Sequence, residues 1–252
     1  MSTTLSDAGL QLADSSVISS ATQLGMRNLL INPRFQINQR GYVSGTATGG
    51  VNQYCHDRWR IPTTGQSVTF STTAGTTTVT TPASGYEQVI ENLNVIGGNY
   101  VFWMNGSATT VVVRQSADNV TYSVVTPTNG QYAITGGNYV KVNISGGTVS
   151  YAMFELAATA SRGMDYRPYS VELALGQRYF EVLVNTQYAP SDGTNNVFGG
   201  VWHTEKRTIP TLTYSANFTF TSLAATTSGW YGYIAGISSV RSVTSITAAA
   251  EL

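Results

Sequence analysis

The stretch that decides the fold is a five-residue motif that the chain carries twice. Residues 97–101 read GGNYV, and residues 136–140 repeat the same five letters. Each copy leads through alternating apolar and polar residues to a turn sequence, first at Asn105-Gly106 and then at Gly146-Gly147. Alternation on both sides of such turns is typical of antiparallel strands. We therefore predict two similar β-hairpins, over residues 97–113 and 136–156, within a β-sandwich.

The composition of the whole chain favours a β-protein as well. Only 10% of the 252 residues are charged, against about 25% in ordinary soluble domains. Long surface helices are rich in Glu, Lys and Arg, so this composition excludes them. The 13 basic residues balance the 13 acidic ones. This balance argues against nucleic acid as a partner, because phosphates demand a positive field.

Arginine greatly outnumbers lysine. Lys141 and Lys206 are the only lysines among the 13 basic residues. Arginine makes paired and planar contacts, whereas lysine mainly keeps surfaces hydrated. We interpret the bias as a sign that much of the surface lies against other protein.

The pattern along the chain predicts four parts. Residues 1–27 contain no aromatic residue and are predicted to be an arm for attachment or oligomerisation. Residues 28–168 form a jelly-roll-like β-sandwich, residues 169–188 a helical joint and residues 189–252 a second small β-domain. The fold class is therefore all-β. The individual strands that we predict cover residues 28–32, 35–38, 54–61, 67–70, 76–80, 197–206, 211–220, 229–237 and 243–249.

The joint carries the one helix that the sequence predicts. Ser170 is the expected N-cap, Glu172 lies in the first turn, and the helix is expected to run from Val171 to Phe180. Gly176 inside it costs about 1 kcal/mol relative to alanine. Such a glycine indicates close packing or an early helix end.

No targeting or membrane segment is expected. The first residues lack the basic and apolar regions of a signal peptide, and no apolar run approaches the roughly 20 residues of a membrane span. Cys55, the single cysteine, is predicted to be a small buried apolar residue. We expect a protein made in the cytoplasm and released as part of a particle.

Three stretches of the chain resemble a known family. They are residues 28–41 (NLLINPRFQINQRG), residues 54–59 (YCHDRW) and residues 154–180, which contain FEL, YRP and ELALGQRYF. In this order they resemble phage and prophage tail-fibre proteins whose first domain is similar to carbohydrate-binding β-sandwiches. Residues 207–213 and the final Ala250-Glu251-Leu252 are similar to later parts of such fibres.

The resemblance implies a structural motif, a location in a virion and a set of partners. The motif comprises Phe35, Asn38, Arg40, Asp57, Arg58, Trp59, Gln177, Arg178 and Tyr179. The setting is the periphery of a virion tail or baseplate. The chain would form a homotrimer, attach to tail proteins through residues 1–27, and bind host surface polysaccharide.

Sequence patterns typical of enzyme active sites are weak in this chain. His56-Asp57-Arg58 is a charged cluster, but we interpret it as a buried Asp–Arg pair beside Trp59 and near Arg40. His203 and Glu205 alternate along a predicted strand, yet no third metal ligand accompanies them. We predict no catalytic residues, no metal and no cofactor.

Sugar binding needs flat aromatic faces with polar neighbours. The candidates are Trp202, Trp230, Tyr231 and Tyr233. On a strand, Tyr231 and Tyr233 share one face and Trp230 takes the other, so only one of these sets can face solvent. Trp59 and Trp103 are predicted to lie in the core.

The function that we expect is multivalent, non-covalent adhesion of a virion tail fibre to host glycans. Two other functions remain open. One is a purely structural particle protein, such as a baseplate connector or a head decoration. The other is a glycan-degrading fibre.

Overall fold

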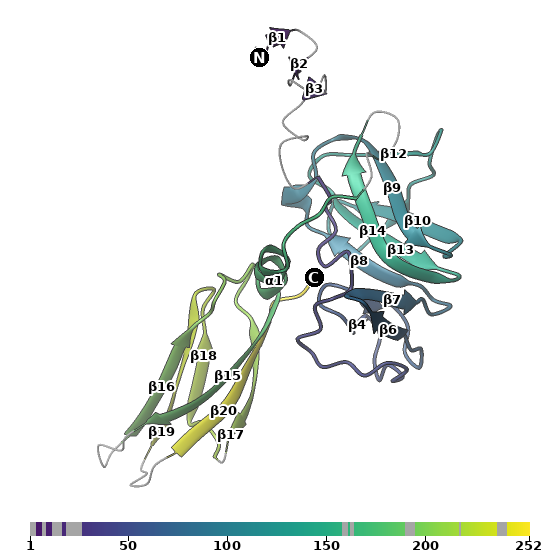
Figure 1. Ribbon diagram of the computed structural model, residues 1–252. Coiled ribbons are helices and arrows are strands. Elements are labelled where there is room, and N and C mark those ends of the chain that lie inside the picture. The colour runs from purple at the N-terminus through teal and green to yellow at the C-terminus, as the bar shows by residue number, and fades with distance from the viewer. Residues whose placement is uncertain are drawn as a thin grey trace.

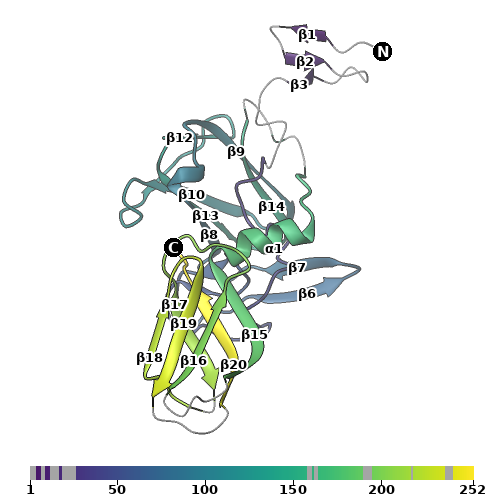
Figure 2. The ribbon, with the colours of Figure 1, turned by 90° about the vertical axis from the view of Figure 1, so that its left-hand side faces the viewer.

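The fold was taken from a computed structural model, which describes residues 4–6, 9–11, 17–18, 27–157, 161, 164–189, 195–216, 218–235 and 241–252. Strands make up 45% of the chain and helices 6%. All strand pairs in the described residues are antiparallel. The all-β fold class is therefore confirmed. Two modules lie on either side of the short helix α1 (Figures 1 and 2).

The first module is a sandwich of two sheets, with the order β11-β10-β13-β8-β5-β4 in one and β12-β9-β14-β7-β6 in the other. The strands of the first sheet are β4 (Gln53–Tyr54), β5 (Arg60–Ile61), β8 (Tyr86–Ile90), β10 (Thr110–Ser116), β11 (Ser123–Val124) and β13 (Tyr139–Ser145). Those of the second are β6 (Thr69–Thr73), β7 (Thr76–Thr80), β9 (Gly98–Gly106), β12 (Gln131–Ile134) and β14 (Thr148–Leu156). A short 3-10 helix, η2 (Asn92–Asn94), follows β8.

The two predicted hairpins are wrong. β9 and β10 follow one another in sequence but lie in different sheets, and so do β13 and β14. Instead, β9 pairs with β14 and β10 pairs with β13. Alternation cannot distinguish a hairpin from a chain that crosses between sheets, because the strands look the same in both. The two copies of the motif therefore build opposite layers of one sandwich.

Glycine makes this crossing possible. A methyl group added to Gly106 would lie 2.1 Å from the Thr148 carbonyl oxygen, and one added to Gly147 would lie 2.6 Å from that of Ser107. At the start of the repeated motifs, Gly97 and Gly136 pack against each other: a methyl group on Gly136 would lie 2.7 Å from the Gly97 nitrogen. All three close approaches require glycine, because the Cβ atom of any other residue would overlap the neighbouring backbone.

The segment that precedes the sandwich strands differs from expectation. Residues 28–32 and 35–38 form no strand, although Phe35 and Ile37 are buried and Gln36 between them is partly exposed. Asn32 and Phe35 have φ values of 53° and 55°, outside the β region. The residues alternate in burial, but only Leu29 and Pro33 make backbone bonds to β14, and other backbone nitrogens of the segment bond to the side chains of Asn28, Gln88 and Glu172.

The helix is shorter than predicted and begins earlier. α1 spans Tyr169–Gln177 with Pro168 as its N-cap and no side-chain cap, so Ser170 lies inside the helix. The early helix end expected at Gly176 is found, since the helix ends one residue later, whereas a methyl group at Gly176 would make only an ordinary contact, 3.6 Å from the Asp57 carboxylate. Phe180 belongs to a strand, so the predicted joint over residues 169–188 is partly sheet.

The second module is a smaller sandwich of two three-stranded sheets, ordered β15-β20-β17 and β16-β19-β18. Its core contains Trp202, Phe220 and Trp230. The distal β-domain thus begins at Phe180, before the predicted boundary at residue 189. Its strands are β15 (Phe180–Ala189), β16 (Asn195–Val201), β17 (Thr211–Ala216), β18 (Ser222–Ala225), β19 (Gly229–Ala235) and β20 (Arg241–Ala249).

Three short strands precede the first module. They are β1 (Thr4–Ser6), β2 (Gly9–Gln11) and β3 (Val17–Ile18), paired in that order. The rest of residues 1–26 falls outside the described residues, so the attachment role of this arm stays a prediction. Among the described helices, none is both long and apolar enough to cross a membrane.

We predict that Gly136→Ala destabilises the protein by about 1–3 kcal/mol, because its methyl group would press into the Gly97 backbone. The free energy of unfolding in urea measures this. Gly50→Ala is the control, since its methyl group would meet nothing within 4 Å, and it should not destabilise. Equal stability of the two variants would contradict the close packing of the motif copies.

Candidate functional site

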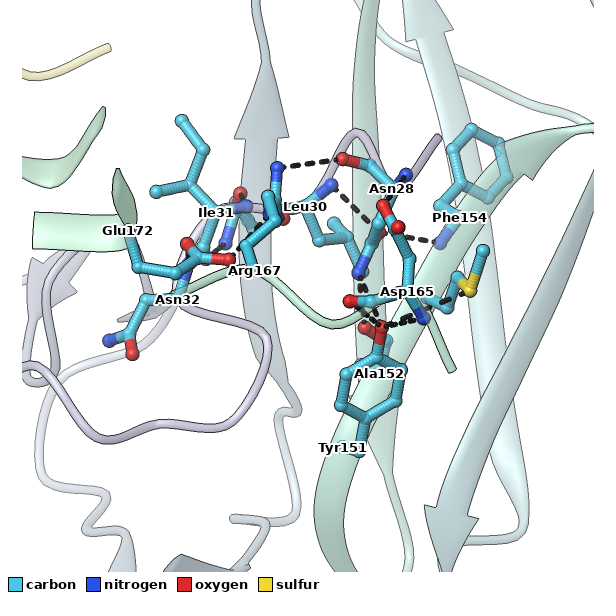
Figure 3. A network of polar contacts seen from close by, with 12 residues as sticks. Asn28, Leu30, Ile31, Asn32, Tyr151, Ala152, Phe154, Asp165, Arg167 and Glu172 are labelled. Atoms are coloured by element: carbon cyan, nitrogen blue, oxygen red, sulfur yellow. Dashed lines mark hydrogen bonds and ion pairs between the residues drawn. The ribbon is translucent and has the colours of Figure 1, made fainter. Parts of the chain in front are cut away.

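Asn28 replaces strand pairing at the start of the first module. Its side-chain Nδ2 donates to the Ala152 carbonyl at 2.9 Å, and its Oδ1 accepts from the backbone nitrogen of Phe154 at 3.1 Å. Figure 3 shows this amide facing β14. The backbone nitrogen of Leu29 also donates to the Phe154 carbonyl at 2.9 Å. One side chain therefore attaches the incoming chain to the edge of a core strand.

Arg167 connects that same segment to α1. Its Nε lies 2.6 Å from Glu172 Oε1, while its two terminal nitrogens donate to the carbonyls of Asn28 and Leu30. Glu172 Oε2 accepts from the Asn32 backbone nitrogen at 2.8 Å (Figure 3). Burial raises the pKa of Glu172, and Arg167 opposes this. The helix is thus fixed to the start of the sandwich by an ion pair whose two members also bond to the backbone.

A tight turn between β4 and β5 places the second polar cluster. The Cys55 nitrogen bonds to the Trp59 carbonyl at 2.9 Å, and Arg58 has a φ of 72°. Trp59 is buried, and its ring lies 4.9 Å from that of Phe35. Cys55 is buried as predicted, and burial raises its pKa to about 11. The turn directs Arg58 away from this aromatic core and toward α1.

Arg58 lies at the centre of the contact between the modules. It is buried, its guanidinium is 3.6 Å from the centre of the Tyr179 ring, and its Nη1 lies 2.6 Å from Glu251 Oε2. Arg40 binds the other oxygen of Glu251 at 2.7 Å and stacks on Phe180 at 3.6 Å. Both cations are thus held by one carboxylate and by rings that follow α1. Figures 1 and 2 show the C-terminal residues returning to this junction.

The expected Asp57–Arg58 pair does not form. Asp57 accepts instead from the backbone and side-chain nitrogens of Gln39, and the carboxylate partner of Arg58 is Glu251. The positive φ of Arg58 separates these adjacent side chains. The other members of the predicted motif lie close by: Asn38 bonds the Tyr42 backbone at 2.9 Å, Arg178 pairs with Glu91 at 3.4 Å, and Gln177 offers its carbonyl to Lys206.

More contacts join the modules around this pair. Arg207 of the second module binds Glu91 of the first at 2.6 Å, and the Leu252 carbonyl accepts from Tyr54 and Arg60 at 2.9 and 2.7 Å. Arg60 also binds Glu87 at 2.9 Å. These arginines therefore make contacts within this chain. The interpretation that the arginine-rich surface lies against other proteins stays a prediction.

A third buried carboxylate organises the second module. Glu181, fully buried, contacts Lys206 through one oxygen and His203 through the other. Glu205 lies apart and accepts from Thr227 at 3.2 Å. Within the described residues there is no group of three or more metal-ligating side chains. His203 and Glu205 are therefore not brought together with a third ligand.

The predicted sugar-contact residues separate into two pairs. Trp202 and Trp230 are only 6% and 4% exposed and belong to the core of the second module. Tyr231 and Tyr233 are 56% and 39% exposed. A buried ring offers no face to a sugar, so Tyr231 and Tyr233 remain as the predicted contacts. Trp103, expected in the core, is half-buried against Tyr151.

A second group of exposed apolar side chains went unnoticed in the sequence. Met164, Tyr166, Tyr169 and Val171 are all exposed, and they lie within eight residues of one another at the joint. Two of them flank a small pocket that Arg34 also lines. Tyr166 belongs to the YRP stretch of the resemblance, but nothing in the spacing of that stretch indicates that its tyrosine faces solvent.

Comparison of the chain with models of protein families, with curated proteins and with solved structures finds no significant match.

We predict that Glu251→Gln lowers the free energy of unfolding by about 3–5 kcal/mol, because it leaves Arg58 buried without a carboxylate. Glu205→Gln changes an exposed acid and should stay within about 0.5 kcal/mol of the parent. Urea unfolding measures both. A loss below about 1 kcal/mol for Glu251→Gln would show that the buried arginines do not depend on this carboxylate.

The buried side chains of His56 and Asp57 should change the stability of the fold in opposite directions as the pH falls. Burial lowers the pKa of His56 to about 4 and raises that of Asp57 to about 6. Acidification from pH 6.5 to 4 protonates His56 only in the unfolded chain and so destabilises the fold. From pH 6 to 4 it protonates Asp57 mainly in the folded chain and so stabilises the fold.

The two contributions therefore oppose each other in the parent. Asp57→Asn should make stability fall more steeply between pH 6 and 4, and His56→Asn should make it fall less or rise. Unfolding in urea at several pH values gives the slopes. Identical slopes for the parent and both variants would contradict the buried titrations.

Proposed function

We propose that this chain is an adhesion protein of a virion tail fibre, and that it binds host-surface glycans through the second module. The observation that carries the proposal is the outer face of β19. Tyr231 lies between Gly199 of β16 and Ala224 of β18 in the strand register. These small neighbours leave the side of the Tyr231 ring uncovered, which suits stacking with the C–H face of a sugar.

The arrangement of the modules supports the same proposal. The ion pairs of Arg58, Arg40 and Arg207 connect the second module, which carries Tyr231, to the first. Single sugar contacts are weak, but several linked copies raise the overall avidity by orders of magnitude. The resemblance of residues 28–41, 54–59 and 154–180 to tail-fibre proteins suggests the setting.

One observation favours the structural alternative. Val197 and Val201 are strongly exposed on the same sheet as Tyr231, and exposed apolar side chains on a sheet also suit a protein partner. Removal of residues 1–27 distinguishes the two functions. A fibre would lose assembly and keep cell binding, whereas a particle that fails to form would support the connector.

We predict that Tyr231→Ala with Tyr233→Ala reduces binding of the purified full chain to host cells tenfold or more, because both exposed rings are removed. Val124→Ala, an exposed residue of β11 in the first module, is the control and should bind as the parent does. Fluorescently labelled protein and flow cytometry measure the binding. Unchanged binding by the double variant would overturn the proposed contact face, and shorter chains after incubation with host polysaccharide would favour a glycan-degrading fibre.

A further inference from the structure

A small pocket opens at the joint, on the surface above the Arg167–Glu172 pair. Its wall includes Pro33, Arg34 and Gln36 from the first module, and Tyr166 and Tyr169 beside α1. None of these five residues belongs to the predicted contact face on β19. The pocket therefore needs an explanation of its own.

The buried polar side chains beneath the pocket already bond to other groups of the chain. Arg167 and Glu172 are bonded to each other and to the backbone of residues 28–32. Asn32 Nδ2 donates to the carbonyls of Ile37 and Asp57 at 2.8 and 3.1 Å. Asp165, the acid next to Tyr166 in the chain, accepts from the Asn28 nitrogen at 3.1 Å. The wall residues Tyr166 and Tyr169 are exposed whereas Arg167 and Glu172 are buried, so the wall presents the groups that a ligand would meet.

The wall has more donors than acceptors. Arg34 and Gln36 both donate to the same acceptor, the Gly75 carbonyl, and the Arg34 contact is long at 3.5 Å. A guanidinium has five N–H donors in a planar fork. No ion pair joins Arg34 to a carboxylate in the part of the chain that the structure describes. This corner therefore carries a positive charge with unused donors, which suits an oxyanion.

Aromatic rings stand beside this charge. Tyr166 is 66% exposed and Tyr169 is 55% exposed. The Arg34 guanidinium lies 5.7 Å from the centre of the Tyr166 ring, within range of a cation–π contact. A flat ring next to a planar cation matches a pyranose that carries a carboxylate, because the C–H face covers the ring while the carboxylate reaches the guanidinium.

We propose that this pocket binds an acidic saccharide, with the sugar carboxylate held by Arg34 and Gln36 and the sugar ring stacked on Tyr166 or Tyr169. This site goes beyond the proposed function, which uses Tyr231 and Tyr233 in the second module. It also gives the ligand a chemical class, a uronic-acid-containing glycan.

Titration of the purified full chain with a tetrasaccharide of glucuronic acid tests the proposal, with a neutral glucose tetrasaccharide as the matched ligand. The acidic ligand should bind at least tenfold more tightly than the neutral one. Arg34→Gln and Tyr166→Ala should each weaken acidic binding tenfold or more, and added salt should weaken it in the parent. Thermal unfolding of each variant shows whether the fold is intact. Arg34→Lys keeps the positive charge but loses the planar fork of donors, so its affinity for the acidic tetrasaccharide should lie between that of the parent and that of Arg34→Gln.

Val124→Ala, an exposed residue of β11 outside both proposed sites, is the control and should leave this binding unchanged. Equal binding of both tetrasaccharides, full binding by Arg34→Gln, or competition by acetate as strong as by the tetrasaccharide would each overturn the proposal. Failure of the double tyrosine variant to affect cell binding would overturn the proposed contact face on β19 and leave this site standing. Loss of tetrasaccharide binding in Tyr231→Ala would assign the acidic ligand to the second module instead.

Discussion

The buried pairing of Arg58 with Glu251 is the contact on which the arrangement of the two modules depends. A buried guanidinium is costly unless a carboxylate and further hydrogen bonds compensate it, and Arg58 obtains the carboxylate from the last residues of the chain and a ring from Tyr179. The first module is therefore complete only when the chain has passed through the second and returned. Arg40 on the other oxygen of Glu251 makes the junction a network.

This requirement explains why one short helix lies where it does. α1 is held at its start by the Arg167–Glu172 pair and is followed directly by Tyr179 and Phe180, whose rings cover the two arginines. The Asp57 side chain packs beside Gly176 of the helix. The ion pairs of Arg40, Arg58, Arg178 and Arg207 lie where the two β-sandwiches meet. Exposed tyrosines lie at that joint, Tyr166 and Tyr169, and on the second module, Tyr231 and Tyr233.

Prediction from the sequence succeeded for properties that depend on the local residue pattern, and it failed for the choice of which strands pair with each other. Alternation predicted that Tyr231 and Tyr233 lie opposite Trp230, and burial confirms this, because neighbouring residues of a strand always face opposite sides. The same alternation predicted hairpins at Gly106 and Gly147, yet both are crossings between sheets. The strand period carries no information about which strand is the neighbour.

The sequence by itself determined an all-β chain, a glycine-containing motif repeated in two strands, a short helix near residue 170 and a second small β-domain, since composition and periodicity act within a few residues. Only the tertiary structure decided that Arg58 turns to Glu251 and not to adjacent Asp57, because a positive φ separates neighbours and the partner is distant in sequence. It also decided that Trp202 and Trp230 fill a core while Tyr166 and Tyr169 face solvent. Exposure of an aromatic ring depends on what packs against it, and that is a property of the assembled chain.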